Sequence, residues 1–172
     1  MIYIALFVVF VFAIAAVQVK SNNKRKIKVE RFAAEAPSRI RIFNDSMNLL
    51  EKTNNAQTFI GRVVDVEEFM SWAIEQVKNG MPLQMEGNIL TVRNKTNELI
   101  NRNALRVALA EFAKWNEVPR KTGTRFDTAT IKMFDAVDGL TGCLKEADNK
   151  SEVQTEILRI RDLVEGIYAD VK

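Results

Sequence analysis

The chain has 172 residues, with 25 Lys or Arg against 22 Asp or Glu, one cysteine and no histidine. The absence of histidine excludes His-dependent acid–base catalysis, Ser-His and Cys-His dyads, and most zinc sites. The single cysteine, Cys143, excludes an intramolecular disulfide, which suits a reducing compartment such as the cytosol.

The first 19 residues contain no charged side chain, and residues 20–41 then contain eight basic ones. As a helix, Met1–Val19 is about 28 Å long, which matches the ~30 Å hydrocarbon core of a bilayer. Because lipid offers no hydrogen bonds to unpaired amides, a spanning segment of this kind has to be helical. The sequence therefore predicts a single-pass transmembrane helix, acting as a signal-anchor, at Met1–Val19.

The basic residues after the apolar stretch predict the orientation of this anchor. Lys and Arg concentrate on the cytoplasmic side of membrane proteins, and no basic residue precedes the stretch. We therefore expect the N-terminus outside, the soluble domain in the cytoplasm, and a location in the inner or plasma membrane. The same basic residues either only set the topology or also contact anionic lipid headgroups, at about 1 kcal/mol each near the surface. They are Lys20, Lys24, Arg25, Lys26, Lys28 and Arg31.

Two other interpretations of the apolar stretch are open. Ala13-Ile14-Ala15 has the small-x-small form of a signal-peptidase site, and cleavage near Ala15 would give a secreted helical protein. A signal peptide, however, has its basic region before the apolar stretch, whereas here the basic residues follow it. A buried core helix is the remaining interpretation, and the length of the charge-free run disfavours it.

Residues 20–36 are predicted to form a basic juxtamembrane linker or an extension of the anchor helix. A helical domain covers residues 37–172, and Pro37 stands where a helix can begin. Apolar residues spaced three and four apart between Ile40 and Leu50 predict the first helix of this domain.

Four more helices are predicted from the same spacing. The stripe Phe59–Val77 defines the second helix, and Asn79-Gly80 is a good helix stop. The later helices are expected at about 88–118, at 127–147, and from 151 almost to the last residue. The side chains expected to face inward on the fourth helix are Ile131, Phe134, Val137, Leu140 and Leu144.

No segment alternates with a period of two between turn residues, so no strand is expected. The predicted fold is all-α, with an N-terminal single transmembrane helix followed by a four- to five-helix bundle-like cytosolic domain. We expect Glu67 and Glu75 on the outer face, where substitution has little effect on stability. The buried positions on which this bundle depends are Val66, Met70, Val107 and Ile160.

One loop is a candidate anion site. Pro119–Arg125 places Arg120, Lys121 and Arg125 around Gly123, and guanidinium groups with backbone N–H groups can hold a phosphate. The loop lacks the residue order of a P-loop and follows a helix rather than a strand. A solvated interhelical loop is therefore the competing interpretation.

The remaining polar motifs are weak. A stretch rich in Arg and Asn, from Arg93 to Arg106, contains residue types that contact bases, but the domain is net acidic and nucleic acid is not expected as a partner. The carboxylates near Asp65 and the pair Asp135 and Asp138 can bind a hard cation or act as acid and base. They match no EF-hand or Glu-x-x-His pattern, so we assign no catalytic residue, metal or cofactor.

The sequence favours a non-enzymatic, membrane-anchored helical interaction or scaffold protein. Its expected partners are the lipid bilayer, including anionic headgroups, and either another protein or a second copy of the chain. One alternative is an enzyme or ligand-binding bundle that uses carboxylates and arginines in a core pocket near Asn103. The other is the secreted helical protein described above.

Overall fold

The computed structural model describes residues 2–81, 83, 89–116 and 124–169, without the side chains of residues 2–22, 116 and 124–126. All regular structure in these residues is helical, which confirms the predicted all-α class. The helices are α1 (Ile2–Lys52), α2 (Ala56–Lys78), α3 (Ile89–Asn116), α4 (Thr124–Gly142) and α5 (Lys150–Ala169).

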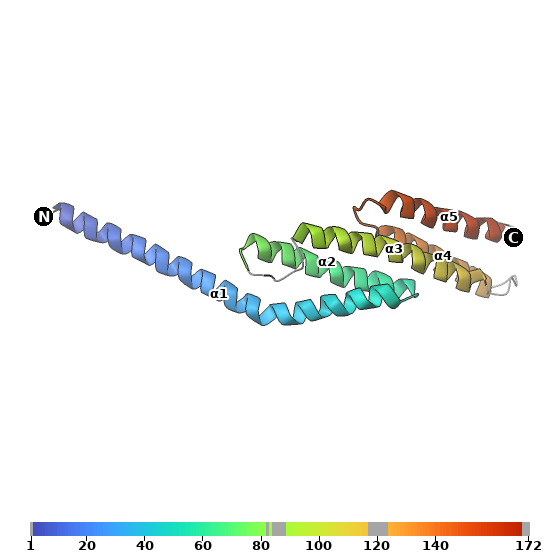
Figure 1. Ribbon diagram of the computed structural model, residues 1–172, viewed down its shortest axis with the longest axis horizontal. Coiled ribbons are helices and arrows are strands. Elements are labelled where there is room, and N and C mark those ends of the chain that lie inside the picture. The colour runs from blue at the N-terminus through green and yellow to red at the C-terminus, as the bar shows by residue number, and fades with distance from the viewer. Residues whose placement is uncertain (1, 82, 84–88, 117–123, 170–172) are drawn as a thin grey trace.

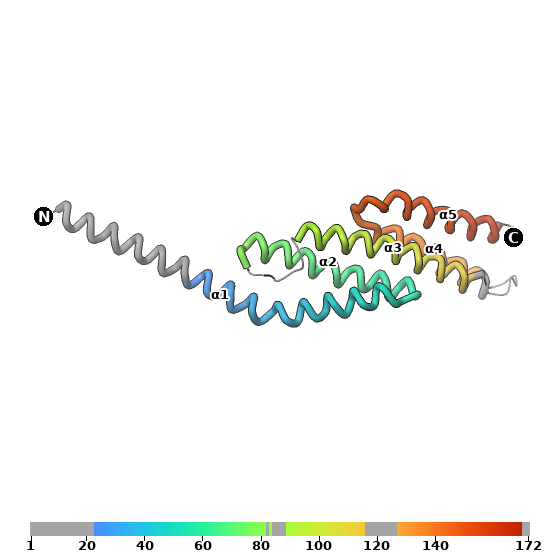
Figure 2. The backbone as a smooth tube through the Cα atoms, viewed as in Figure 1, coloured from blue at the N-terminus to red at the C-terminus, as the bar shows by residue number. Residues whose placement is uncertain are grey.

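The helices form an elongated bundle with α3 at its centre. Figure 1 shows α2, α3, α4 and α5 side by side with alternating directions, and α3 packs against all four other helices. The second half of α1 lies along α2, as the tube in Figure 2 shows, whereas in Figure 1 the first half projects away from the bundle. Each amphipathic helix thus buries its apolar stripe against neighbours on more than one side.

Helix α1 runs through residues 20–36, which agrees with the helix extension that was one of the two expectations for this segment, but it does not begin at Pro37 as expected. It is continuous from Ile2 to Lys52, and Pro37 lies inside it rather than at its first turn. Proline lacks the N–H that would bond to the carbonyl four residues earlier, so it bends a helix without ending it when packing holds both sides. Figure 1 shows such a change of direction along α1. Packing already begins at Phe32 and Ala36, so the end of the predicted linker belongs to the bundle.

The predicted transmembrane segment, Met1–Val19, lies outside the residues whose side chains are described. Among the described residues, no helix combines the length and the apolar character needed to cross a membrane.

The ends of the other helices follow local chemistry. Asn55 caps α2, because its side chain accepts a 2.8 Å hydrogen bond from the backbone N–H of Thr58. At the other end Gly80 has a φ of 71°, a left-handed conformation that favours glycine, and the predicted stop is confirmed. Helix α4 ends at Gly142, five residues before the predicted Ala147, because α3 holds the following residues in a separate turn.

The core confirms most of the predicted stripes. All four positions named as critical, Val66, Met70, Val107 and Ile160, are buried. The phase expected for α4 was wrong at Ile131, which is 59% exposed, while Met133 takes the inward position. Val77 is also exposed, because α2 ends there without a neighbour to cover it.

A second buried row on α2, which includes Phe69 and Trp72, packs against α1. The rings of Phe43 and Phe69 stack with centroids 4.4 Å apart, and those of Phe32 and Trp72 stack at 5.8 Å. The guanidinium of Arg39 lies 5.3 Å from the Trp72 ring centroid, within range of a cation–π interaction. These contacts fix the point at which α1 leaves the bundle.

Candidate membrane-facing segment and polar clusters

The basic segment of α1 stands clear of the bundle. Every residue from 23 to 31 is exposed, and successive residues rotate by about 100° around a helix, so the cations are spread around more than half of its circumference. We call residues 23–31 the stalk. The stalk holds five of the six predicted lipid contacts, and the side chain of Lys20 lies outside the described residues. The five are Lys24, Arg25, Lys26, Lys28 and Arg31.

Part of this positive charge is paired within the chain. Arg31 Nε lies 2.8 Å from Glu35 Oε1, and the hydrogen bond from Arg31 lowers the pKa of the Glu35 carboxyl. Lys26 Nζ lies 3.9 Å from Glu30, and exposed pairs of this kind contribute little to stability. Lys24 and Arg25 form no ion pair with another described residue. The stalk therefore remains net positive.

The stalk is also tied to the end of α2. Lys28 Nζ donates a 3.3 Å hydrogen bond to Asn79 Oδ1, which is 51 residues later in the chain. Just beyond, the stacked rings of Phe32 and Trp72 lie beside the same end of α2. The exposed basic turns are therefore the last part of α1 before it joins the packed domain.

The predicted anion loop cannot be placed. Arg120, Lys121 and the side chain of Arg125 lie outside the described residues, so the anion site stays a prediction.

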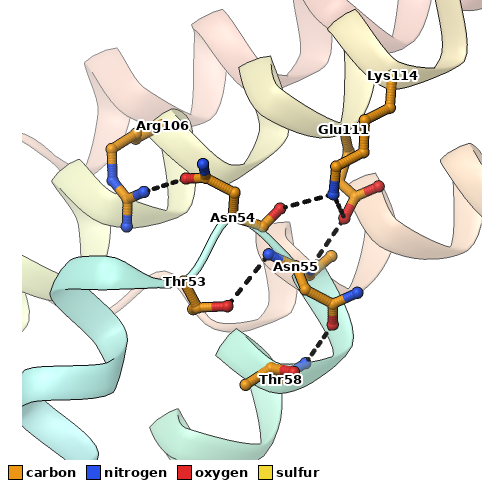
Figure 3. Close-up of polar contacts among 8 residues, drawn as sticks. Thr53, Asn54, Asn55, Thr58, Arg106, Glu111 and Lys114 are labelled. Carbon is orange, nitrogen blue, oxygen red and sulfur yellow. Dashed lines mark hydrogen bonds and ion pairs between the residues drawn. The ribbon is translucent and has the colours of Figure 1, made fainter.

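A polar cluster joins α3 to the turn between α1 and α2 (Figure 3). Arg106 donates to the carbonyl of Leu50 at 3.0 Å and to Asn54 Oδ1. Glu111 accepts a 3.0 Å hydrogen bond from the N–H of Ala56, the first residue of α2. Lys114 Nζ donates to the carbonyl of Asn54 at 3.2 Å. The cluster thus supplies partners to backbone groups that helix ends leave unpaired.

The opposite turn, between α4 and α5, is held by two buried asparagines. Asn97 Nδ2 donates to the carbonyl of Glu146 at 2.8 Å. Asn101, which is fully buried, donates to the carbonyl of Lys145 at 3.2 Å and accepts from its N–H at 3.0 Å. In the sequence, the spacing of four residues between Asn97 and Asn101 indicates that the two side chains share one face of the helix. These side chains face the interior, so they are not placed to contact bases.

Asn103, the residue around which a polar core pocket was considered, is also engaged locally. Its Nδ2 donates to the carbonyl of Leu99 at 3.0 Å, and its Oδ1 accepts from Arg106 Nε at 3.1 Å. It therefore orients Arg106 toward the α1–α2 turn. Asn97 and Asn101 connect α3 to the α4–α5 turn. The two bonds of Asn103 hold Arg106 within α3, so all three asparagines have a structural role.

The candidate carboxylates are mostly held in ion pairs between or along helices. Asp65 Oδ2 lies 2.8 Å from Arg62 and accepts a 3.0 Å hydrogen bond from the buried Ser46 hydroxyl. Glu67 pairs with Lys145 at 3.0 Å, and Asp138 with Arg161 at 3.5 Å. In the described part of the chain no group of three or more Asp, Glu, Cys or His is arranged to hold a metal ion.

Several grooves lie on the surface of the described bundle; some are lined mainly by polar residues, and two have a larger apolar share. The larger, about 710 Å³, runs between α2 and α4 and is lined by Ile60, Val63 and Val64 together with Glu67 and Lys145. Cys143 also lines it but is buried, and burial raises the pKa of its thiol. The second, about 440 Å³, lies between α1, α2 and α3. Its apolar lining residues include Phe43, Met47, Phe69, Val92 and Leu99.

Evidence on function comes from the residues and geometry of the chain itself. No family model, curated protein or solved structure matches it.

Proposed function

We propose that this chain is a membrane-anchored interaction protein, with a single transmembrane helix at Met1–Val19 and its helical bundle on the cytoplasmic face. One observation supports this above the others: α1 is a single unbroken helix that connects the uncharged stretch to the bundle through the exposed basic stalk. A stop-transfer flank needs solvated cations next to the apolar segment, and the stalk provides them.

The orientation follows from the same cations. Six Lys or Arg lie within twelve residues of Val19, which favours the cytoplasmic side for the stalk and for everything after it. Stalk residues not paired within the chain, such as Lys24 and Arg25, are available to anionic headgroups. The lone thiol, Cys143, is buried and suits a reducing compartment.

A non-enzymatic interaction role fits the described bundle better than catalysis. The buried Asn97 and Asn101 and the half-buried Arg106 are hydrogen-bonded to the backbone where helices end or turn, whereas apolar residues form a large share of the lining of the two grooves described above. Apolar grooves suit docking of another protein or of a second copy. Anchoring raises the local concentration on the membrane, so a modest affinity becomes effective there.

Alkaline carbonate extraction of membranes that contain the full chain tests the anchor. The unaltered chain should stay in the membrane pellet, and Val9→Arg with Phe12→Arg should release it, because charges at a span centre cost about 3 kcal/mol each. A matched control, Val64→Arg with Ile131→Arg, changes two exposed apolar residues of the bundle. The control should remain in the pellet. Release of the unaltered chain by carbonate would refute the anchor.

Protease accessibility tests the orientation. Protease added to intact cells should spare the region after Lys20, and protease added to opened cells should digest it. Digestion of this region from outside would reverse the proposed topology.

Crosslinking in native membranes tests the interaction role. The full chain should give a discrete crosslinked species, and arginine at Val64 in the larger groove should reduce its yield if that groove is the interface. Recovery of the chain only as an uncrosslinked monomer would contradict the interaction role.

A further inference from the structure

The end of α2 lies close to the level at which the stalk would leave a bilayer. Figure 1 shows the last turn of α2 and the first turns of α3 on the side of the bundle from which α1 projects. The Lys28–Asn79 hydrogen bond fixes this end beside the stalk. Lys28 comes eight residues after Lys20, about 12 Å along a helix. Headgroups extend about 5–8 Å beyond the hydrocarbon core, so Lys78 would lie within about one Debye length of them.

One face of the first turns of α3 is exposed at the same end, whereas Ile89 and Val92 pack against the core. Leu90 and Arg93 lie on the face of α3 that carries Asn97, four residues after Arg93. Asn97 holds the α4–α5 turn through Glu146, so residues before it extend about 6–10 Å past that turn. Leu90 is consequently 62% exposed, although the same face is buried farther along α3. Transmembrane helices tilt by about 20° on average and up to ~40°, which is enough to lower this face toward headgroups.

Charge separates this end of the bundle from the other. We call residues 75–81 and 89–95, as far as they are described, the anchor end. Together with the stalk it contains eight Lys or Arg and only two acidic residues, Glu30 and Glu75. The described parts of 49–58, 106–115, 127–135 and 159–169, at the opposite end, contain six basic and six acidic residues. Among the described residues, the anchor end and the stalk together carry a net positive charge, whereas the opposite end is balanced, so the anchor end complements a negatively charged surface.

We propose that the anchor end is a second contact surface for an anionic bilayer, in which Lys78 and Arg93 approach headgroups and Leu90 lies at the interface. The bundle is then held against the membrane in one pose instead of moving freely on its tether. This inference rests on the proposed anchor and adds a surface of the bundle that the stalk alone does not provide. Juxtamembrane cations of this kind bind anionic leaflets in a salt-dependent way.

Energy transfer between the bundle and the lipid surface tests it. The full chain, with Cys143→Ala and Asn94→Cys carrying a donor dye, is reconstituted into vesicles with acceptor-labelled headgroups. Transfer should be stronger in vesicles with 30% phosphatidylglycerol than in pure phosphatidylcholine, and 0.5 M NaCl should abolish the difference. Lys78→Glu with Arg93→Glu should lower the ratio of docked to undocked bundles about tenfold or more. The matched control, Lys52→Glu with Lys132→Glu at the opposite end, should leave the ratio unchanged.

Carbonate extraction of the same vesicles separates the two possible failures. A chain that carbonate removes would refute the anchor and, with it, this inference. A retained chain would overturn this inference alone if its energy transfer is equal in the two lipids, or falls equally with both double variants. The vesicles contain no other protein. If the anchor end binds a protein and not lipid, the energy transfer should therefore be equal in the two lipids.

Discussion

Asn101 and Lys145 exchange two hydrogen bonds across 44 residues of sequence. The amide of Asn101 donates to the Lys145 carbonyl at 3.2 Å, and its oxygen accepts from the Lys145 N–H at 3.0 Å. One side chain thereby replaces the partners that two backbone groups lose where α4 ends. Because Asn101 is fully buried, water cannot take its place.

Replacing this residue should be costly. Asn101→Ala removes the hydrogen-bond partner of the Lys145 N–H and carbonyl and opens a cavity in the core, so we expect the free energy of unfolding to fall by about 3 kcal/mol. Asn94→Ala, at an exposed position on the same helix, should lower it by less than about 0.5 kcal/mol. Urea unfolding of the full chain in mild detergent, followed by the fluorescence of the buried Trp72 and Trp115, measures both. Similar losses of stability in Asn101→Ala and Asn94→Ala would show that the hydrogen bonds of Asn101 to Lys145 do not stabilise the fold.

The helical phase of α2 gives a second matched pair. Val66 is buried and Val64, two residues earlier, is 52% exposed. Val66→Lys must bury an unpaired charge or open the bundle, so it should cost about 4 kcal/mol or more, whereas Val64→Lys should cost less than about 0.5 kcal/mol. Urea unfolding followed by tryptophan fluorescence measures the loss of stability in both variants. Equal losses at the two positions would refute the packing of α2.

Most of the helices were predictable, because one-sided burial imposes a 3.6-residue period on the sequence. Three features were not predictable from that period. Pro37 has a strong local preference for a first turn, and packing of the flanking turns on α2 overrides it. The inward face of α4 includes Met133 rather than Ile131, a choice that depends on where α2 and α5 lie. The end of α4 depends on Asn101, which is 44 residues distant.

The polar clusters were harder to predict than the helices. Asn and Arg on α3 are equally compatible with solvent, a base edge or a buried backbone group, and only the positions of other helix ends distinguish these. The last turn of α1 at Leu50 determines the role of Arg106, and the α4–α5 turn at Lys145 determines the role of Asn101. The lipid contacts proposed for the stalk were predicted from charge and from adjacency in the sequence, and they needed no knowledge of where the other helices lie.

The structure changes what we expect at Glu67. Its exposure fits the sequence prediction of a tolerant outer position, but its carboxylate lies 3.0 Å from Lys145 on the neighbouring segment. Glu67→Lys removes this half-exposed pair and places two cations together, so it should cost about 1 kcal/mol. Glu75→Lys should cost less than about 0.5 kcal/mol. The charge swap Glu67→Lys with Lys145→Glu should recover most of the loss, and failure to recover it would show that the pair contributes nothing.

Cys143 should make the stability of the bundle depend on alkaline pH. Burial raises the pKa of its thiol in the folded protein, whereas the unfolded thiol keeps an ordinary pKa of about 8.5. Below that pH both states are protonated, and the thiol contributes no pH dependence. As the pH rises past about 8.5 the unfolded chain loses its proton first, which favours unfolding until the folded pKa is also passed.

The free energy of unfolding should therefore fall between pH 8 and 10 by more in the unaltered chain than in Cys143→Ala. Lysine and tyrosine titrate in the same range, so only the difference between the two chains is diagnostic, and parallel pH curves would show that the thiol is not desolvated.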